Sequence, residues 1–401
     1  MDGLLLSDAL QVLLERAEKI EECETVSLWE ASGRVLAENI TATRNQPPFD
    51  RSPLDGYAVR SSDIKGASKE HPVTLTVIDE VDAGHVTQKV VENGTTVRIM
   101  TGAPIPKGAD CVVGQEDTDY GEDRVEIYEE IQRHQNYCFE GEDYQAGTVL
   151  LKKETVIGAV EAGVIASLGR GSVKVYRLPK VSVITTGDEI ILPGEELLPG
   201  KIYDSNLYTL VTRLKSWGMT IEEKGRAEDD AQVVAEKMKE AFQHSDLIIT
   251  TGGVSVGKKD IMHDVLKILN CKKLFWKIAI KPGMPTLCAE YEGKLLICLS
   301  GNPYGATVNL ELLIRPLLAK MTGRKDLEIR REKANCMSAF PKKSFVTRYV
   351  RAYYGDGKVQ IASGSNASGI LSSMCGCNCL IEIVAGTNSV EIGDEVEVVL
   401  L

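Results

Sequence analysis

Glycine-rich turns carry the residues of this 401-residue chain that are best suited to chemistry on an anion. The most informative is residues 250–260, which follow the apolar run 246–249 and therefore predict a loop after a buried strand. Glycine lets backbone N–H groups approach phosphate oxygens, because no Cβ stands in the way. Two lysines and an aspartate at the end of the turn add cations and a candidate metal ligand. A plain turn is the competing interpretation of this segment alone.

The same succession of apolar strand and polar turn occurs twice more, in residues 181–189 and 295–303. In an open α/β sheet, the carboxyl ends of parallel strands form the ligand crevice. If the three strands are neighbours, their turns should therefore converge at one edge of the sheet.

Two lysines, Lys277 and Lys281, indicate a second anion site. If residues 276–283 form an extended strand, the even spacing sends both ammonium groups to one face. Two like charges beside apolar neighbours are costly unless an anion or carboxylates neutralise them. Surface lysines on an edge strand are the alternative explanation.

Two further loops hold polar residues in restrained backbone. The proline-rich residues 47–58 include Asp55, and residues 100–110 place Thr101 where Gly102 permits close approach. A structural turn explains either loop nearly as well. Glycine-rich loops for phosphate, carboxylates for Mg²⁺ and paired lysines for another oxyanion together suggest metal-assisted phosphoanhydride cleavage or transfer.

Composition limits the class of protein. With 43% hydrophobic and 26% charged residues the chain is typical of folded soluble proteins, and its length predicts about two to four domains. The 46 basic against 58 acidic residues give a formal charge of −12, which argues against a nucleic-acid binder. We find no membrane span or secretory segment in the sequence, so a cytoplasmic location is expected.

The ten cysteines are scattered except for Cys375, Cys377 and Cys379. This cluster could bind a metal or react with oxidants, but a second cluster or a histidine pair is missing from the sequence pattern. We therefore favour small buried cysteines, and leave their role open.

The elements that must position these residues follow from periodicity. An opening helix is predicted over residues 7–20, with Ser7 as its N-cap. The remaining segments are a β-rich region at 26–149, a helix at 156–168, an α/β region from 179 with helices starting at Asp204 or Ser205, at 230 and at 303, and a β-rich end after 323.

The motifs, in this order, resemble the molybdopterin molybdenumtransferase family, the MoeA and gephyrin E-domain group, over almost the entire chain. The segments that carry the resemblance are 52–58, 101–104, 141–143, 186–189, 251–257 with Asp260, 281–283 and 301–303. The loop 251–260 alone also resembles related molybdopterin-binding domains, including adenylyltransferases and a nucleotide-processing group. Only the full set distinguishes the insertase.

The resemblance implies a multidomain α/β plus β protein with a central three-layer α/β molybdopterin-binding domain. The implied domains are an elongated N-terminal domain (1–26 with 44–50 and 142–177), an inserted β domain (27–43 with 51–141), the α/β domain (178–324) and a C-terminal β-barrel (325–401). It also implies a homodimer with a shared active site, and a molybdopterin adenylyltransferase and recipient molybdoenzymes as partners.

The implied reaction inserts molybdate into adenylylated molybdopterin, with Mg²⁺-dependent loss of AMP, to give molybdenum cofactor. Residues matched to catalytic positions are Asp55, Thr101, Asp143, Lys277 and Lys281. Residues matched to Mg²⁺ are Glu189, Asp260 and Asp229, with Asp230 an alternative to Asp229. Residues matched to substrate binding are Thr186, Gly187, Gly252, Gly253, Ser255, Gly257, Gly301, Asn302 and Pro303, with Lys281, Pro282 and Arg348 assigned to molybdate.

The chain departs from the family pattern near its third turn. Members commonly read Pro-Gly-Asn-Pro followed by a small hydroxyl residue, whereas this chain has Ser300 at the first position and Tyr304 and Gly305 after the motif. The loss of one expected oxyanion donor keeps tungstate open as an alternative to molybdate. Two different functions also stay open, a gephyrin-like scaffold that binds partner peptides and an adenylyltransferase.

Overall fold

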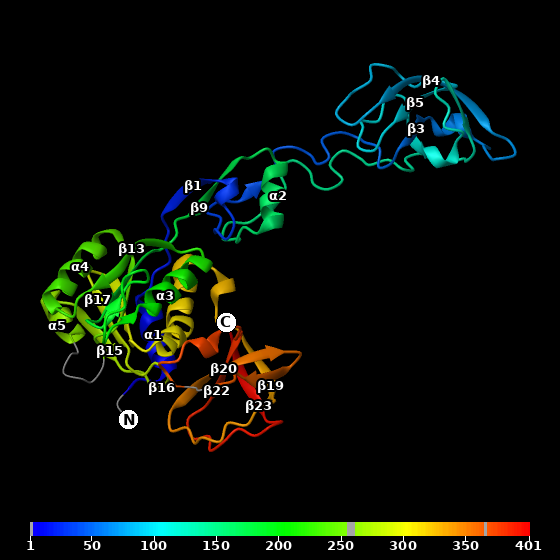
Figure 1. Ribbon diagram of the computed structural model, residues 1–401. Helices are drawn as coiled ribbons and strands as arrows, with labels where there is room; N and C mark the ends of the chain where they lie inside the picture. The colour runs from blue at the N-terminus through cyan, green and yellow to red at the C-terminus, as the bar shows by residue number, and fades with distance from the viewer. Residues whose placement is uncertain (1–2, 255–260, 365–366) are drawn as a thin grey trace. The chain divides into compact units, whose positions relative to one another are not determined.

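The computed structural model describes residues 3–254, 261–364 and 367–401. Contacts divide the chain into two units (Figure 1). The first comprises Met1–Ala37, Val156–Gly158 and Ser172–Leu401, and the second comprises Glu38–Thr155 and Ala159–Gly171. Among the described residues, none of the helices is long and apolar enough to cross a membrane.

A six-stranded sheet forms the centre of the first unit. Its order is β13 (Thr220–Ala227), β10 (Lys180–Thr186), β14 (Leu247–Thr251), β18 (Lys294–Leu299), β17 (Leu287–Tyr291) and β15 (Lys272–Trp276). The first four strands are parallel, and β17 pairs antiparallel with both of its neighbours. The three strands that precede the glycine-rich turns, β10, β14 and β18, are therefore adjacent, as the sequence predicts.

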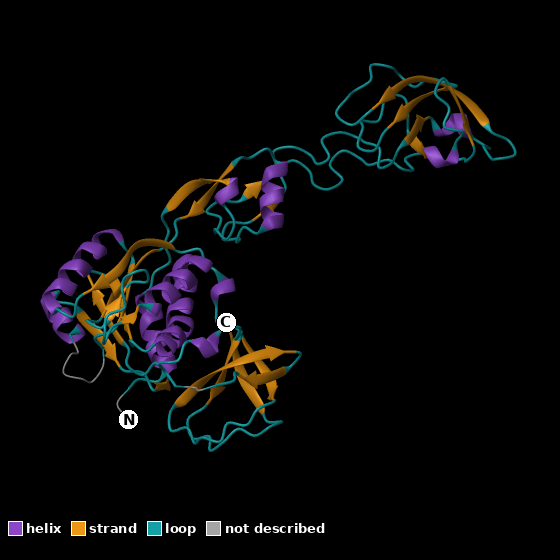
Figure 2. Ribbon diagram, viewed as in Figure 1, coloured by secondary structure: helices purple, strands orange, loops and turns teal. Residues whose placement is uncertain are grey.

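Helices cover both faces of this sheet, which gives the predicted three layers (Figure 2). Val181 and Val183 of β10 belong to one apolar core, whereas Ile184 belongs to the other, because successive side chains of a strand point to opposite faces. The helices of the first core are α1 (Leu6–Arg16), α3 (Ser205–Ser216), α6 (Pro303–Asn309), the π-turn η4 (Leu310–Ile314) and α7 (Arg315–Thr322). Those of the second are α4 (Ala231–His244) and α5 (Met262–Ile268).

The prediction that Asp204 or Ser205 caps a helix is confirmed for Asp204. The Asp204 carboxylate accepts from the Leu207 N–H at 2.9 Å at the start of α3, and the Asp230 carboxylate caps α4 in the same way. The prediction for Ser7 is wrong. Helix α1 starts one residue earlier, lacks a side-chain cap, and ends at Arg16, and the chain is extended at Ala17. Beyond it, the Ile20 N–H donates to the Met321 carbonyl of α7, so packing replaces the last helical turn.

A closed β-barrel ends the first unit. Its strand order is β16 (Ile280–Lys281), β20 (Thr347–Gly355), β21 (Lys358–Ile361), β19 (Arg331–Cys336), β23 (Glu395–Leu400) and β22 (Cys379–Ile383), and an additional β20–β22 pairing closes it. Strand β16 comes from the α/β region, so the segment around Lys281 is held by the barrel. Two-stranded sheets β1 (Cys23–Ser27) with β9 (Ser172–Tyr176), and β11 (Ile190–Ile191) with β12 (Ile202–Tyr203), complete the unit.

The second unit is mostly β, as its short strand-like runs predict. Its sheet has the order β6 (Cys111–Gly114), β3 (Gly56–Val59), β5 (Thr95–Ile99), β4 (Val73–Val81) and β7 (Arg124–Ile127). Separate from it lie the pair β2 (Ile40–Thr41) and β8 (Val149–Leu151), and helix α2 (Ala159–Ser167). The four-domain boundaries inferred from the resemblance stay a prediction.

Candidate functional site

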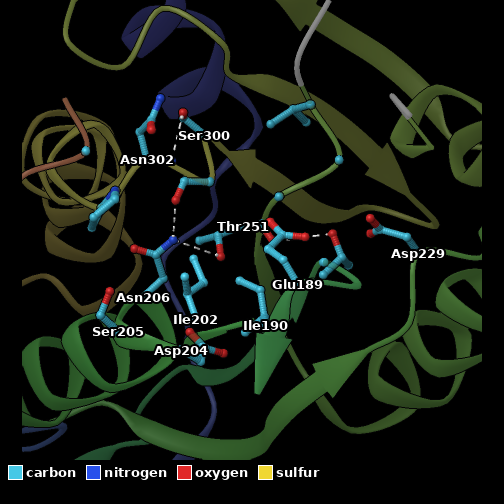
Figure 3. A pocket seen from close by; sticks show the side chains of 18 of the residues that line it. Glu189, Ile190, Ile202, Asp204, Ser205, Asn206, Asp229, Thr251, Ser300 and Asn302 are labelled. Atoms are coloured by element: carbon cyan, nitrogen blue, oxygen red, sulfur yellow. Dashed lines mark hydrogen bonds between the residues drawn. The ribbon is translucent and has the colours of Figure 1, made fainter. Parts of the chain in front are cut away.

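A pocket of about 510 Å³ lies at the carboxyl edge of the central sheet (Figure 3). It is lined by the turns after β10, β14 and β18, so the predicted convergence of the three turns is confirmed. Predicted binding residues that line it are Thr186, Gly187, Gly252, Gly253, Gly301, Asn302 and Pro303. Ser255 and Gly257 lie outside the described residues.

Gly252 is required for a reason that the sequence does not reveal. Its φ is +95°, and a Cβ at this position would lie 2.2 Å from the Thr186 carbonyl oxygen. The glycine therefore allows the β10 and β14 turns to touch, in addition to any approach to a ligand. At Gly253 (φ +65°) the nearest atom to such a Cβ would be the Ile261 side chain at 3.0 Å, which can move.

Three carboxylates line the same pocket: Asp204, which caps α3, and the predicted ligands Glu189 and Asp229. Asp230 is occupied as the N-cap of α4, so Asp229 is the member of this pair that faces the pocket. The third predicted ligand, Asp260, lies outside the described residues. Within the described ranges, clusters of three or more metal-ligating side chains are absent. Glu189 and Asp229 still fit Mg²⁺, which commonly binds one or two carboxylates together with substrate phosphates and water.

Residues in the first turn of α3 connect the strand ends that line the pocket. Our sequence predictions did not include them in the site. The Thr185 hydroxyl donates to Asp204 at 2.5 Å, which fixes α3 to the end of β10. The Asn206 amide nitrogen donates to the Gly301 carbonyl at 2.8 Å and lies 3.4 Å from the Thr251 hydroxyl. One side chain thus connects the ends of β14 and β18. The available signal was three successive polar residues at a helix start.

A second cavity, of about 250 Å³, has a cationic lining. Lys281 of β16 and Arg348 of β20 are direct partners in the parallel register, and both line it together with Pro282. The Arg348 guanidinium lies over the Phe340 ring at 5.5 Å, and its buried Nε lacks an acceptor within the described part of the chain. The two residues assigned to one oxyanion are therefore brought together from distant parts of the sequence.

The loop that carries Pro282 is held by buried polar contacts. The Asn309 amide donates to the Gly283 carbonyl at 2.9 Å and to the Thr286 hydroxyl at 2.7 Å. A Cβ on Gly305 would lie only 3.2 Å from the Gly283 nitrogen, which is closer than side chains normally pack. The glycine at this position therefore lets α6 pack against the loop.

The prediction that Lys277 and Lys281 share one strand face is wrong. Strand β15 ends at Trp276, and Lys277 has a φ of +67° with its ammonium 4.1 Å from the centre of the Trp276 ring. The chain leaves the strand because the N-terminal segment pairs here: the Ala279 N–H donates to the Leu4 carbonyl at 2.7 Å. A contact with a segment so distant in sequence is invisible in local periodicity.

In the second unit, Asp55 and Thr101 contact each other. One Asp55 oxygen accepts from the Thr101 N–H at 2.7 Å and from its hydroxyl at 2.6 Å. These hydrogen bonds, chiefly that of the hydroxyl, hold the pKa of Asp55 below its ordinary value. Asp143 is exposed, and its N–H donates to the Gln46 carbonyl at 2.9 Å. The Thr101 turn therefore presents an ionised Asp55 carboxylate in a fixed orientation.

The prediction that the clustered cysteines are buried holds for Cys379 only, because Cys377 is half-buried and Cys375 is exposed. Burial raises the pKa of the Cys379 thiol to about 12, and burial also raises the pKa of Cys377. Both effects disfavour the thiolate, which is the form that binds metals.

Three family models match the chain in succession. They are the MoeA N-terminal region (domain I and II) at residues 4–169, a probable molybdopterin binding domain at 182–320, and the MoeA C-terminal region (domain IV) at 333–401. A curated molybdopterin molybdenumtransferase of Staphylococcus aureus is 37% identical over 379 residues, which cover 94% of this chain and 90% of the relative. The chain belongs to the molybdopterin molybdenumtransferase family.

Other members support the assignment. A molybdopterin molybdenumtransferase of Staphylococcus epidermidis is 36% identical over 398 residues, covering 98% of this chain and 95% of that one. The crystal structure of a molybdopterin biosynthesis moeA protein from Pyrococcus horikoshii OT3 matches with a TM-score of 0.82 and 32% identity, over 100% of both chains.

The departures from the molybdopterin molybdenumtransferase pattern have local explanations. Ser300, in place of the common proline, accepts from the Asn302 N–H at 3.2 Å and so stabilises the turn after β18. Tyr304 is buried, and its hydroxyl donates to the Tyr349 carbonyl of the barrel at 2.8 Å. This family member thus uses the altered positions for packing between the α/β layers and the barrel.

Proposed function

We propose that this chain is a molybdenum insertase, which inserts molybdate into adenylylated molybdopterin with Mg²⁺-dependent release of AMP, to form molybdenum cofactor. Relatives named molybdopterin molybdenumtransferase align over almost the whole chain, which supports this reaction. The observation that carries the proposal is that one compact unit holds both a glycine-rich pocket and a dicationic cavity.

The glycine-rich pocket is the proposed site of the adenylylated pterin. Its turns present backbone groups at the ends of three parallel strands, where α/β sheets bind phosphorylated ligands. The matched residues Ser255 and Gly257 remain part of the proposal. The rigid strand ends would orient the pyrophosphate before the reaction begins.

Glu189 and Asp229 would hold Mg²⁺ in this pocket, with Asp260 as the third proposed ligand. When bound, the cation would offset the negative charge of the pyrophosphate oxygens as the bond to AMP breaks. Gly252 and Gly301 line the pocket with uncharged backbone. Among the described residues, its negative charges are the carboxylates of Glu189, Asp204 and Asp229, of which the cation would screen the first and the last.

Lys281 and Arg348, with Pro282, form the proposed molybdate site. A dianion between two opposed cations would relieve their mutual repulsion, which is the electrostatic basis of the assignment. Asp55, Thr101, Asp143 and Lys277 remain proposed functional residues. A homodimer is also part of the proposal, and sedimentation of the full chain measures it directly.

The decisive experiment supplies adenylylated molybdopterin, Mg²⁺ and molybdate to the full chain and measures AMP release together with molybdenum bound to the pterin. Both products are expected. A folded protein that releases no AMP would refute the insertase. If both oxyanions are supplied in competition and AMP release depends on tungstate, the substrate oxyanion is tungstate and not molybdate. The match over all three family models does not favour an adenylyltransferase or a scaffold.

Substitutions in the dicationic cavity distinguish the proposed molybdate site from the proposed site of the adenylylated pterin. Lys281→Ala and Arg348→Ala are expected to raise the molybdate concentration for half-maximal AMP release about tenfold or more, because a charge-assisted contact is lost. Affinity for the adenylylated pterin should stay unchanged. Lys272→Ala, an exposed lysine on β15, is the matched control. Equal effects at Lys272 and Lys281 would rule out a specific oxyanion site.

A further inference from the structure

Asn206 is a buried amide whose orientation the structure fixes. The residue is 5% exposed and occupies the first turn of α3, inside the pocket of Figure 3. Its nitrogen must be the atom facing Gly301, because an oxygen 2.8 Å from that carbonyl oxygen would be repelled. The other amide atom is therefore an oxygen, a hydrogen-bond acceptor.

That oxygen, Oδ1, is buried and finds no hydrogen-bond donor among the described residues. Buried polar atoms are nearly always paired in folded proteins, since an unpaired one loses its hydration without compensation. Asn206 also lines the pocket, and because Oδ1 itself is covered, a bound donor would reach it through a small shift of the pocket wall. The amide is held firmly, because Asp204 caps the helix and accepts from Thr185 of β10.

The chemistry of an amide oxygen restricts what it can bind. Phosphate oxygens of an ionised ester are acceptors and cannot pair with it, so this point of the pocket is not a phosphate contact. Apolar side chains of Ile190, Ile202 and Pro285 line the same pocket. Apolar surface beside a single acceptor suits the edge of a flat heterocycle that carries an N–H group.

We propose that Asn206 Oδ1 accepts a hydrogen bond from a ring-edge N–H of the bound substrate, while its amide nitrogen holds the ends of β14 and β18. The inference rests on the proposed function for the substrate, whose pterin and adenine rings both carry such N–H groups. Asn206 is then a specificity-determining residue that recognises a heterocycle at the junction of the three turns.

The test measures dissociation constants of the full chain and of Asn206→Ala for three ligands. These are adenylylated molybdopterin, AMP, and purine riboside 5′-monophosphate, which lacks the exocyclic amine of AMP. If the adenine amine is the donor, the variant binds the first two about tenfold more weakly and the third unchanged. If the pterin is the donor, only adenylylated molybdopterin is weakened. Either result supports the proposal and identifies the ring.

An equal loss for all three ligands would show that Asn206 only maintains the pocket or contacts a ribose hydroxyl, and would overturn the inference, as would unchanged binding of all three. Gln232→Ala, an exposed amide on α4, is the matched control and should change none of the constants. If the alanine variant does not fold, Asn206→Ser is measured with the same ligands. Wild-type protein that fails to bind adenylylated molybdopterin would instead contradict the proposed function.

Discussion

Alanine in place of Gly252 should destabilise the first unit by roughly 3 kcal/mol. The φ of +95° costs a residue with a Cβ about 1–2 kcal/mol. The new Cβ would also lie 2.2 Å from the Thr186 carbonyl oxygen and 2.8 Å from its hydroxyl. The carbonyl belongs to the backbone of β10 and cannot rotate away, so overpacking adds about 1–3 kcal/mol.

Matched glycine variants separate the two contributions to this cost. Gly200 has a φ of +80°, but a Cβ there would meet no heavy atom within 4 Å, so Gly200→Ala should lose only about 1 kcal/mol. Gly253→Ala should lie between the two, since the Ile261 side chain can yield. Urea unfolding followed through the fluorescence of the buried Trp217 measures the differences.

Binding provides a second readout of the same substitution. Because the β10 and β14 turns must separate to admit the methyl group, Gly252→Ala should also weaken adenylylated molybdopterin more than Gly200→Ala does. If Gly252→Ala and Gly200→Ala gave the same unfolding midpoint and the same affinity, the close approach of the two turns would be wrong.

Three further outcomes are expected from other parts of the chain. Thr101→Val removes the hydroxyl that lowers the pKa of Asp55, so that pKa should rise toward 3.8 in a carboxyl NMR titration, and an unchanged value would contradict the contact. Because the pKa of Asp55 is lower in the folded than in the unfolded protein, its ionisation stabilises the fold above about pH 4. This stabilisation is lost as the pH falls through the folded pKa, and Thr101→Val should therefore lose less stability than the wild type over that range. Glu311 is 3% exposed and pairs with two arginines, so Glu311→Gln removes a buried carboxylate from between them and should lower the free energy of unfolding by about 3 kcal/mol. Asp264 forms an exposed ion pair, and Asp264→Ala should leave the midpoint of urea unfolding unchanged. Tyr304→Phe removes a buried hydrogen bond to a β20 carbonyl and should cost about 1 kcal/mol, and a stability equal to wild type would show that this bond is not formed.

Local signals in the sequence were enough for much of the α/β architecture. Asp204 and Asp230 precede amphipathic runs and cap the helices that follow. The apolar runs before the three polar turns became adjacent parallel strands. Once those strands are neighbours, the convergence of their turns is a geometric consequence, so the pocket could be predicted without knowing any side-chain contact.

Long-range contacts account for what local signals missed. The even spacing of Lys277 and Lys281 suggested one strand, but pairing with Leu4 ends it, and Lys281 joins the barrel instead. Asn206 lay within a run already explained as a helix start. Its importance arises from Gly301 and Thr251, which reach it only in the folded sheet.

The altered residues after the third turn affect how the proposed molybdate cavity can discriminate among ligands. Gly305 contributes no hydroxyl, and its lack of a side chain is used for packing against Gly283. The cavity is then lined by the charges of Lys281 and Arg348 and by one serine, Ser368. Charge attracts any tetrahedral dianion, whereas hydroxyl donors in fixed directions distinguish oxyanions by size and geometry. The main effect of Gly305→Ser should therefore be to destabilise the contact between α6 and the loop, and not to improve selectivity, because its Cβ would lie 3.2 Å from the Gly283 nitrogen.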